Sequence, residues 1–322
     1  GLPVELGVEK ALGITKEDIG KKISVAEYNA ACRKDVMKFT KEWEDLTQKM
    51  GYWVDMENPY ITYDNRYIET LWYLLKELYK KGLLYKGYTI QPYSPAAGTG
   101  LSTHELNQPG CYRDVKDTTC TAQFHILDPK PEMAQFGDPY FLAWTTTPWT
   151  LPSNVALCVN PEEDYAKVKA ADGYTYYMAE ALLDTVLGRL ADEEAGTPAY
   201  EVLETYKGKD LEYKEYEPLY DCAAKVAEKQ HKKAFYVTCD GYVTLTDGTG
   251  IVHIAPAFGE DDAKVGRKYE MPFVQLVDER GNMSEETPFA GLFVKKADPE
   301  VLKNLDKRGL LFDAPKFEHS YP

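Results

Sequence analysis

The sequence WTTTPWTLPSN, residues 144–154, marks the end of a predicted strand. The strand stops before Pro148, because proline donates no backbone hydrogen bond and restricts the residue that precedes it. Side chains alternate along a strand, so we expect Thr145 and Thr147 on one face and Thr146 on the other. Threonine also favours strands for structural reasons alone. The segment by itself therefore leaves open whether its hydroxyls serve packing or chemistry.

A second strand ends in the sequence GTGIVHIAPAFGEDD, residues 248–262. His253 lies near the end of this strand, a turn of small residues follows, and a helix is expected to begin at three acids. Acidic side chains in a first helical turn are stabilised by the backbone N–H groups and the helix dipole, which explains Glu260 and Asp261 without any ligand. A buried imidazole with both nitrogens hydrogen-bonded would likewise explain His253. An imidazole and a carboxylate at one turn could equally bind an amine and an ester.

Around these two segments, residues 116–310 predict a β-rich domain. Short runs of strand-favouring residues are separated by Gly, Pro, Asn and Asp, a spacing typical of a closed or strongly curved sheet. The runs cover residues 118–127, 140–147, 155–159, 174–178, 199–206, 234–239 and 251–254, and helices are expected over 179–190, 260–269 and 299–308. We therefore expect an α+β fold, in which helices surround a β-barrel-like sheet.

The first 115 residues predict helices. A capping box of Ser24 and Glu27 precedes an apolar stripe with helical spacing, which predicts one helix of about 25 residues that ends at Gly51. A second helix is expected over residues 64–81, and we interpret both apolar stripes as packing surfaces of a core. The expected division is residues 1–115, a helical segment; residues 116–310, the β-rich domain; and residues 311–322, a short return segment.

Composition excludes several classes of protein. The 322 residues include 37 basic and 52 acidic ones, and the net charge of −15 excludes a generally basic nucleic-acid-binding surface, though not a local basic face. No apolar run approaches the ~18–20 residues that a membrane span needs, and the N-terminus lacks a signal peptide. The chain does not begin with Met, which suggests a piece of a longer protein. Six cysteines without a C-x-x-C pair predict free thiols in a reducing, cytoplasmic compartment.

Common catalytic and metal-binding motifs are absent from the sequence. It contains no G-x-S-x-G, no G-x-x-x-x-G-K-[ST] and no H-E-x-x-H, and its five histidines never occur at the spacing of metal ligands. Neither a serine hydrolase, a phosphate-loop enzyme nor a metallohydrolase is therefore indicated.

The two quoted segments together resemble the editing pocket of the isoleucyl-tRNA synthetases, a family of class I synthetases. Flanking stretches resemble the synthetic core and connector of that family: residues 1–5, 66–72, 82–88 and 319–322. The valine and leucine relatives carry Arg-Pro where this chain has Thr147-Pro148. Both ATP-binding signatures of the family are missing from residues 1–322, so we expect no aminoacylation by this chain, whereas the parent enzyme would use ATP and Mg²⁺.

The resemblance implies hydrolysis of valine wrongly attached to tRNA(Ile). One missing methylene is worth only ~1–3 kcal/mol to a binding pocket, and the isoleucine enzymes are the standard example of this limit and of its remedy, a second hydrolytic pocket. That pocket must admit valine, exclude isoleucine and hydrolyse the ester to the terminal adenosine. An aminoacyl ester is already activated, so well-oriented binding can supply much of the rate without a Ser–His–Asp triad.

The resemblance also implies a role for each candidate residue. Asp262 would bind the ammonium group of the misattached amino acid with a carboxylate that is ionised at neutral pH. The other catalytic candidates, Thr146, Thr147 and Asn154, would bind the terminal ribose, the ester carbonyl or the attacking water. The remaining candidates would bind the substrate's amino-acid part, with the histidine limiting the size of the pocket: Thr145, Trp149, Thr150 and His253.

A tRNA 3′ end would require basic or aromatic surface on this acidic chain. The best local cluster is Lys225, Lys229, His231, Lys232 and Lys233, although a solvated charged face explains it equally well. We expect a monomer with no membrane contact. Two other functions stay open: a tRNA-binding module without catalysis, and the editing domain of a valyl-tRNA synthetase, which would remove threonine.

The family resemblance also bears on zinc. Residues 92–99 align with a stretch where many of these enzymes carry a C-x-x-C zinc pair. The corresponding positions here are Ser94 and Ala97, and neither side chain is a usable zinc ligand. We therefore expect no metal and no cofactor in this chain.

Overall fold

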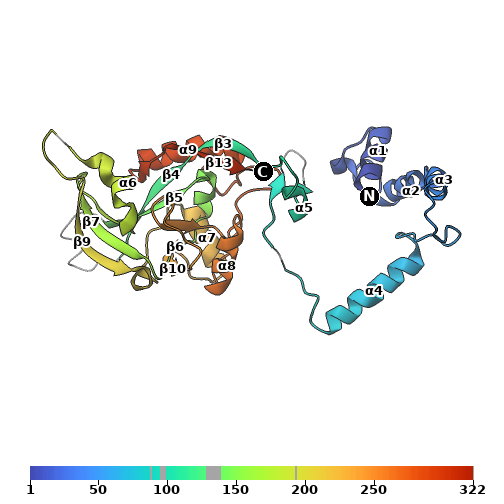
Figure 1. The fold of residues 1–322 in the computed structure, drawn as a ribbon, viewed down its shortest axis with the longest axis horizontal. Coiled ribbons are helices and arrows are strands. Elements are labelled where there is room, and N and C mark those ends of the chain that lie inside the picture. The colour runs from blue at the N-terminus through green and yellow to red at the C-terminus, as the bar shows by residue number, and fades with distance from the viewer. Residues whose placement is uncertain (88, 95–98, 128–138, 193, 322) are drawn as a thin grey trace. The chain divides into compact units, whose positions relative to one another are not determined.

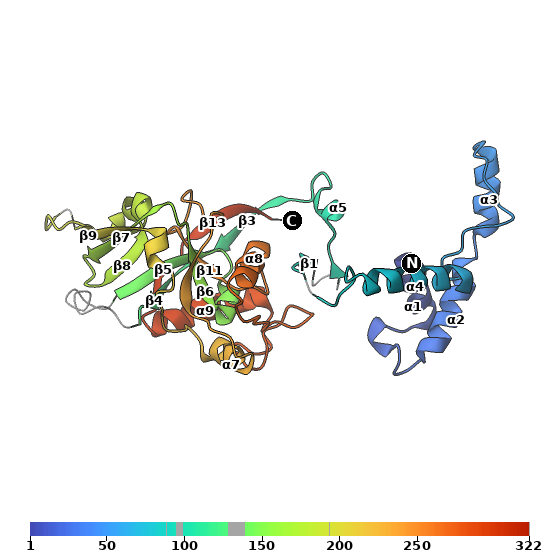
Figure 2. The ribbon, with the colours of Figure 1, turned by 90° about the horizontal axis from the view of Figure 1, so that it is seen from below.

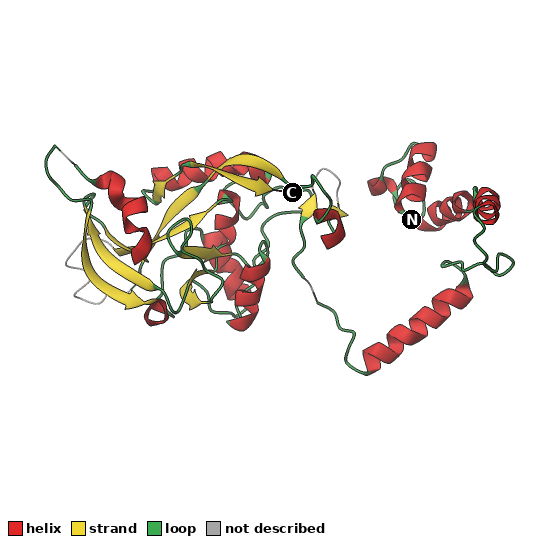
Figure 3. Cartoon of the chain, in the orientation of Figure 1, coloured by secondary structure: helices red, strands yellow, loops and turns green. Residues whose placement is uncertain are grey.

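The computed structural model describes residues 1–87, 89–94, 99–127, 139–192 and 194–321. The chain divides into two compact units, Gly1–Gly87 and Tyr88–Pro322. Figure 3 shows that the described strands belong to the second unit, whereas the first contains helices. The functional division expected at residues 115 and 310 stays a prediction. No helix in the described parts of the chain is long and apolar enough to cross a membrane.

The first unit contains four α-helices: α1 (Leu2–Leu12), α2 (Val25–Val36), α3 (Thr40–Lys49) and α4 (Asn65–Lys80). The prediction of one long helix that ends at Gly51 is wrong, because α2 ends at Val36 and α3 begins at Thr40. Between them, the Thr40 hydroxyl donates to the carbonyl of Met37 at 2.9 Å, and side-chain bonds of this kind compete with the helical ladder. The second predicted helix is confirmed as α4, and Asp64 caps it by accepting the N–H of Arg66 at 2.9 Å.

Most side chains in the apolar stripes of these helices are exposed, so the prediction that the stripes pack in a core is wrong for most of their length. Trp43 on α3 is 69% exposed and Trp72 on α4 is 70% exposed. The unit's buried side chains are Val8 and Tyr28, the latter a member of the first stripe, where α1 and α2 contact each other. Helical spacing predicts which side chains share a face, but it cannot predict whether another element covers that face.

The second unit is built on a curled sheet of nine strands. Their order is β10–β6–β11–β5–β8–β7–β9, and β4 and β12 extend the sheet from the other edge of β5. The strands are β4 (Cys120–His125), β5 (Pro139–Thr145), β6 (Ala156–Val159), β7 (Asp164–Ala170), β8 (Thr175–Ala179), β9 (Tyr200–Lys207), β10 (Tyr236–Cys239), β11 (Ile251–Ile254) and β12 (Leu311–Asp313). Figure 2 shows β9, β7 and β8 side by side, with β5 and β11 following.

The curl of the sheet follows from the pairing of β5. Along one edge β5 pairs with β4 over its length, whereas along the other edge it pairs with β8 near its start and with β11 near its end. Strand β5 therefore joins two parts of the sheet, β8–β7–β9 and β11–β6–β10, and the sheet curls into a half-barrel. This confirms the predicted α+β fold with a barrel-like sheet.

Two smaller ribbons and several helices complete the second unit (Figure 1). The ribbons are β1 (Tyr93–Ser94) with β2 (Thr99–Gly100), and β3 (Arg113–Thr118) with β13 (Lys316–Tyr321). The α-helices are α5 (Thr103–Leu106), α6 (Leu183–Leu187), α7 (Asp221–Lys229), α8 (Glu260–Lys268) and α9 (Val294–Lys307), and a 3₁₀ turn covers Pro148–Ser153. Every run predicted as a strand contains one. The elements that were not predicted are β1, β2, β3, β7, β12, β13, α5 and α7, and α9 begins before the predicted residue 299.

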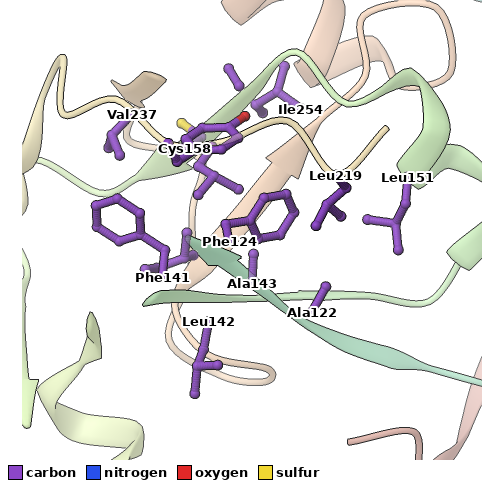
Figure 4. Packing of buried hydrophobic residues seen from close by; sticks show 14 of the residues in the cluster. Ala122, Phe124, Phe141, Leu142, Ala143, Leu151, Cys158, Leu219, Val237 and Ile254 are labelled. Carbon is purple, nitrogen blue, oxygen red and sulfur yellow. The ribbon is translucent and has the colours of Figure 1, made fainter. Parts of the chain in front are cut away.

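The core of the second unit holds the ends of the central strands in place. Phe124 on β4 and Phe141 on β5 are fully buried, together with Leu142 and Leu151 (Figure 4). The ring of Phe124 meets that of Tyr216 edge-on, with centroids 5.3 Å apart. Each such side chain contributes about 1.5–3 kcal/mol by leaving water. The segment after β5 therefore starts from a rigid strand.

Candidate active site

The two motifs singled out in the sequence, residues 144–154 and 248–262, lie at the same end of two neighbouring strands in the half-barrel. Strands β5 and β11 are parallel neighbours, with Val252 paired to Trp144, and β11 also pairs antiparallel with β6. The carboxyl ends of parallel strands lie on the same side of a sheet. The threonines after Trp144 and the turn after Ile254 therefore lie at the same end of the sheet, although about a hundred residues separate them in the sequence.

Three threonine hydroxyls form a cluster where β5 ends. The Oγ1 atoms of Thr145 and Thr147 lie 3.3 Å apart, which confirms that they share a face, and Thr147 Oγ1 lies 3.4 Å from Thr150 Oγ1. The backbone N–H of Thr147 also donates to Thr145 Oγ1 at 3.1 Å. Thr146 is half-buried, and within the described residues its hydroxyl forms no hydrogen bond. The strand end thus presents both a fixed set of hydroxyls and a free one.

His253 is joined to this cluster by hydrogen bonds that fix its tautomer. The Thr150 hydroxyl donates its one proton to the carbonyl of Thr147 at 2.8 Å, so it must accept from His253 Nε2, which lies 2.8 Å away. The other ring nitrogen, Nδ1, faces the amide nitrogen of Asn154 at 3.5 Å. Burial lowers the pKa of His253 to about 4. The imidazole is therefore neutral, with its proton on Nε2.

Asn154 holds the other side of this network and is itself buried, with 2% of its surface exposed. Its amide nitrogen donates to the carbonyl of Ala156 at 2.8 Å, and its oxygen accepts the hydroxyl of Tyr216 at 2.7 Å. The structure thus brings together Asn154, His253 and Thr150, three candidates from the sequence, in one buried chain of hydrogen bonds.

Asp262 is turned inward, unlike the two acids beside it. Its Oδ2 accepts the backbone N–H of Ala255 at 2.9 Å, just beyond the end of β11. Burial raises the pKa of its carboxyl to about 6, so the group is mostly ionised at neutral pH. Glu260 and Asp261 are exposed and form ion pairs with Lys264 at 3.4 and 2.9 Å. Only the third acid of the turn therefore presents a desolvated negative charge at the strand end.

Gly259 makes room for that carboxylate. A Cβ atom at this position would lie 2.8 Å from Cγ of Asp262, which is closer than real contacts allow. The backbone of Gly259 is extended, with φ of −140°, so any residue could adopt it without strain. The glycine is required for the close approach of Asp262 and not for a special conformation.

Trp149 links the segment after β5 to the turn after β11. Its ring meets that of Phe258, in the turn after β11, edge-on at 4.9 Å. Its backbone N–H donates to Oδ1 of Asp298 on α9 at 2.9 Å. Sequence reasoning missed Asp298, because no local pattern marks a side chain that reaches a turn 149 residues away.

Comparison with known proteins places these features in a family. Residues 1–246 match the model of the tRNA synthetases class I (I, L, M and V). The chain belongs to the class I tRNA synthetases. It is 62% identical over 323 residues to the isoleucine–tRNA ligase of Porphyromonas gingivalis, covering 95% of this chain and 28% of the relative. The identity to the Bacteroides fragilis isoleucine–tRNA ligase is 63%, over 94% of this chain and 27% of the relative.

This class I synthetase chain thus spans little more than a quarter of the length of these relatives. Among solved structures, it is similar to the P. knowlesi cytosolic leucyl-tRNA synthetase editing domain. That similarity has 13% sequence identity and a TM-score of 0.45, and it covers 63% of this chain and 97% of the other.

The basic cluster of the synthetase chain is divided between α7 and the turn that follows it. Lys225 and Lys229 are exposed on α7, and His231 is exposed in the turn with a left-handed φ of 54°. Lys232 donates to the carbonyl of Met271 at 3.0 Å, and Lys233 pairs with Glu215 at 2.6 Å. A surface cavity of about 540 Å³ is bordered by His231, Lys232, Lys233 and Arg267.

The described part of the synthetase chain contains no group of three or more His, Cys, Asp or Glu side chains that could hold a metal ion. At the stretch aligned with the zinc pair of relatives, Ser94 is the last residue of β1. Ala97 lies outside the described residues, so the expectation of no zinc at this position stays a prediction.

Proposed function

We propose that this chain carries the editing site of an isoleucyl-tRNA synthetase and hydrolyses the ester between valine and tRNA(Ile). The observation that carries the proposal is that the threonine cluster, His253 and the Asp262 carboxylate all lie at the same end of the neighbouring strands β5 and β11. A desolvated carboxylate and a set of hydroxyls at one strand end match a substrate that carries an ammonium group, an ester and a ribose. The high identity to isoleucine–tRNA ligases favours the isoleucine branch.

In the proposed reaction Asp262 binds the ammonium of the misattached valine. Thr146 and Thr147 bind the ester carbonyl, the terminal ribose or the water. The water oxygen attacks the ester carbon and the bond to the ribose oxygen breaks, which releases valine and leaves the ribose hydroxyl protonated. Asn154 acts through the buried chain that orients His253, as its engaged amide groups support. Thr145 and Thr150 hold the His253 side of the pocket in place, and Trp149 closes the pocket beside them.

Isoleucine is excluded in this proposal by a rigid wall. The His253 imidazole is held through both ring nitrogens and cannot easily swing away. Close-packed surroundings yield little to an additional methylene, so a fixed wall rejects a larger side chain more sharply than a hydrophobic pocket selects it. The partner is then the 3′ end of tRNA(Ile), which Lys225, Lys229 and the turn at His231–Lys233 would attract.

The remaining proposals concern the whole protein. We propose that the chain is monomeric and works in the cytoplasm as part of a longer synthetase that uses ATP and Mg²⁺ for aminoacylation.

Deacylation of charged tRNA tests the proposed function directly. The chain is incubated with valyl-tRNA(Ile), isoleucyl-tRNA(Ile) and threonyl-tRNA(Val), and free amino acid is measured against buffer alone. We expect release of valine, with isoleucine spared. Release of threonine in preference would assign the chain to the valine branch, and binding of charged tRNA without any release would leave a tRNA-binding module.

Substituting Gly259 with alanine is expected to slow deacylation of valyl-tRNA(Ile). The new Cβ would displace the Asp262 carboxylate, and misplacing a substrate-binding group by about 1 Å can cost up to about 100-fold in rate. Gly188→Ala is the matched control, since nothing lies within 4 Å of a Cβ at Gly188. A Gly259→Ala rate equal to that of Gly188→Ala would contradict this placement of Asp262.

A further inference from the structure

A side chain from near the end of the chain caps the turn that carries the site threonines. The 3₁₀ turn Pro148–Ser153 begins after Thr147, and Asp298 on α9 accepts the N–H of Trp149 at 2.9 Å. Thr147 occupies the capping position but makes no capping hydrogen bond with its side chain. The N-terminus of the turn is therefore held by tertiary structure.

This arrangement determines what the Thr147 hydroxyl can do. A threonine in the capping position ordinarily turns its hydroxyl onto a backbone N–H of the turn. Here the Thr147 hydroxyl lies 3.3 Å from that of Thr145 and 3.4 Å from that of Thr150. Because Asp298 satisfies the backbone N–H of Trp149, the Thr147 hydroxyl remains among the threonines at the strand end.

We propose that Asp298 is a positioning residue for deacylation, which holds the turn so that Thr147 and Thr150 keep their places. The inference rests on the proposed function. Asp298 acts through the turn and not on the substrate. Its effect extends to the size-limiting wall, because Thr150 accepts the hydrogen bond from His253 Nε2 at 2.8 Å.

We expect the hydrogen bond, rather than the negative charge, to matter for this role. Burial raises the pKa of Asp298 to about 6, whereas the hydrogen bond from the Trp149 N–H and the charge of Lys295 lower it and Asp117 on β3 raises it. A carboxyl whose pKa is raised on folding from 3.8 to about 6 favours the folded state at low pH, and this contribution is lost as pH rises through that window. An asparagine oxygen could therefore accept the same N–H without the cost of a desolvated charge.

Four variants test this role in deacylation of valyl-tRNA(Ile) at pH 7.5. Asp298→Ala removes the acceptor and Asp298→Glu displaces it, and we expect both to lower kcat by about 10- to 100-fold, because small misplacements in a site cost that much. Asp298→Asn keeps the acceptor and is expected to stay within about threefold of wild type in kcat and KM. Glu300→Ala, on the exposed side of α9, is the matched control and is expected to leave both constants unchanged.

Amide hydrogen exchange at Trp149 provides a readout that needs no substrate. Exchange is expected to be at least about tenfold faster in Asp298→Ala and Asp298→Glu, and unchanged in Asp298→Asn. The proposal would be overturned if Asp298→Glu kept the wild-type kcat, or if Asp298→Asn and Asp298→Glu lost kcat equally. Neither result depends on whether the alanine variant folds. An inactive wild-type chain would refute the proposed function instead, while unchanged exchange at Trp149 in Asp298→Glu would still refute the role of Asp298.

Discussion

Replacing Asp262 with asparagine is expected to abolish release of valine from tRNA(Ile) by this synthetase chain. The amide keeps an oxygen that can accept the N–H of Ala255, but it loses the negative charge that binds the substrate ammonium. Losing one partner of a desolvated charge pair costs ~2–5 kcal/mol, or roughly 30- to several-thousand-fold in rate. The rate of valine release from valyl-tRNA(Ile) measures the loss.

Asp261→Asn is the matched control. Asp261 lies beside Asp262 in the first turn of α8, is exposed, and forms its ion pair with Lys264. It should lose at most a helix-end contribution of ~0.3–1 kcal/mol, which appears in stability and not in rate. An equal fall in rate in both variants would mean that the turn's general negative charge matters and that Asp262 has no special role.

The proposed role of Asp262 also predicts how the rate of deacylation depends on pH. Deacylation by wild type is expected to fall below a midpoint near pH 6, where Asp262 becomes protonated. Stability moves the other way, because the pKa of Asp262 rises from 3.8 to about 6 on folding, so its stabilising contribution is lost as pH rises through that window. A wild-type rate that is flat between pH 5 and 7 would contradict an ionised Asp262 in the reaction.

Substituting His253 with alanine is expected to give the chain a new activity, release of isoleucine from correctly charged tRNA(Ile). Without the imidazole the pocket has room for one more methylene, a group worth about 10- to 200-fold in discrimination. Valine release should fall only modestly, since the imidazole is neutral and does not supply the charge for the ammonium. Both charged tRNAs are measured with wild type and His253→Ala.

A general-base role for His253 predicts a different result. Both substrates would then lose rate together, because the base would be needed for either ester. His125→Ala controls for the loss of a histidine elsewhere in the sheet, at the end of β4, and should leave both rates unchanged. The alanine at 253 also leaves Thr150 and Asn154 without a partner, so unfolding should be easier by about 1–3 kcal/mol.

Local patterns predicted the strand ends of this site well. Strand β11 covers the four residues predicted for it, and the shared face of Thr145 and Thr147 follows from alternation alone. The fold class was predicted because the spacing of short strands reflects a curled sheet. The prediction missed β7, in which the buried Lys167 interrupts the apolar pattern of a strand.

Features that depend on distant contacts could not be predicted from the sequence. The cap on Trp149 comes from Asp298, which precedes Pro299, and that proline suggested a helix start several residues too late. The exposure of Trp43 and Trp72 depends on which surfaces face them, and a single helix carries no signal for that. Burial also raises the pKa of Asp262 from 3.8 to about 6, a change that residue type alone does not predict.

The pairing of β3 with β13 has a consequence for chain entropy. Six residue pairs run from Arg113 with Tyr321 to Thr118 with Lys316, so the strands that enter and leave the half-barrel lie side by side. Adjacent strands are only about 5 Å apart, whereas the closure entropy of a flexible loop grows with the logarithm of its length. Because β3 and β13 hold the two ends of residues 119–315 together, lengthening, shortening or exchanging this insert does not change the distance that its ends must span. The entropic cost of such a change is therefore confined to the half-barrel itself.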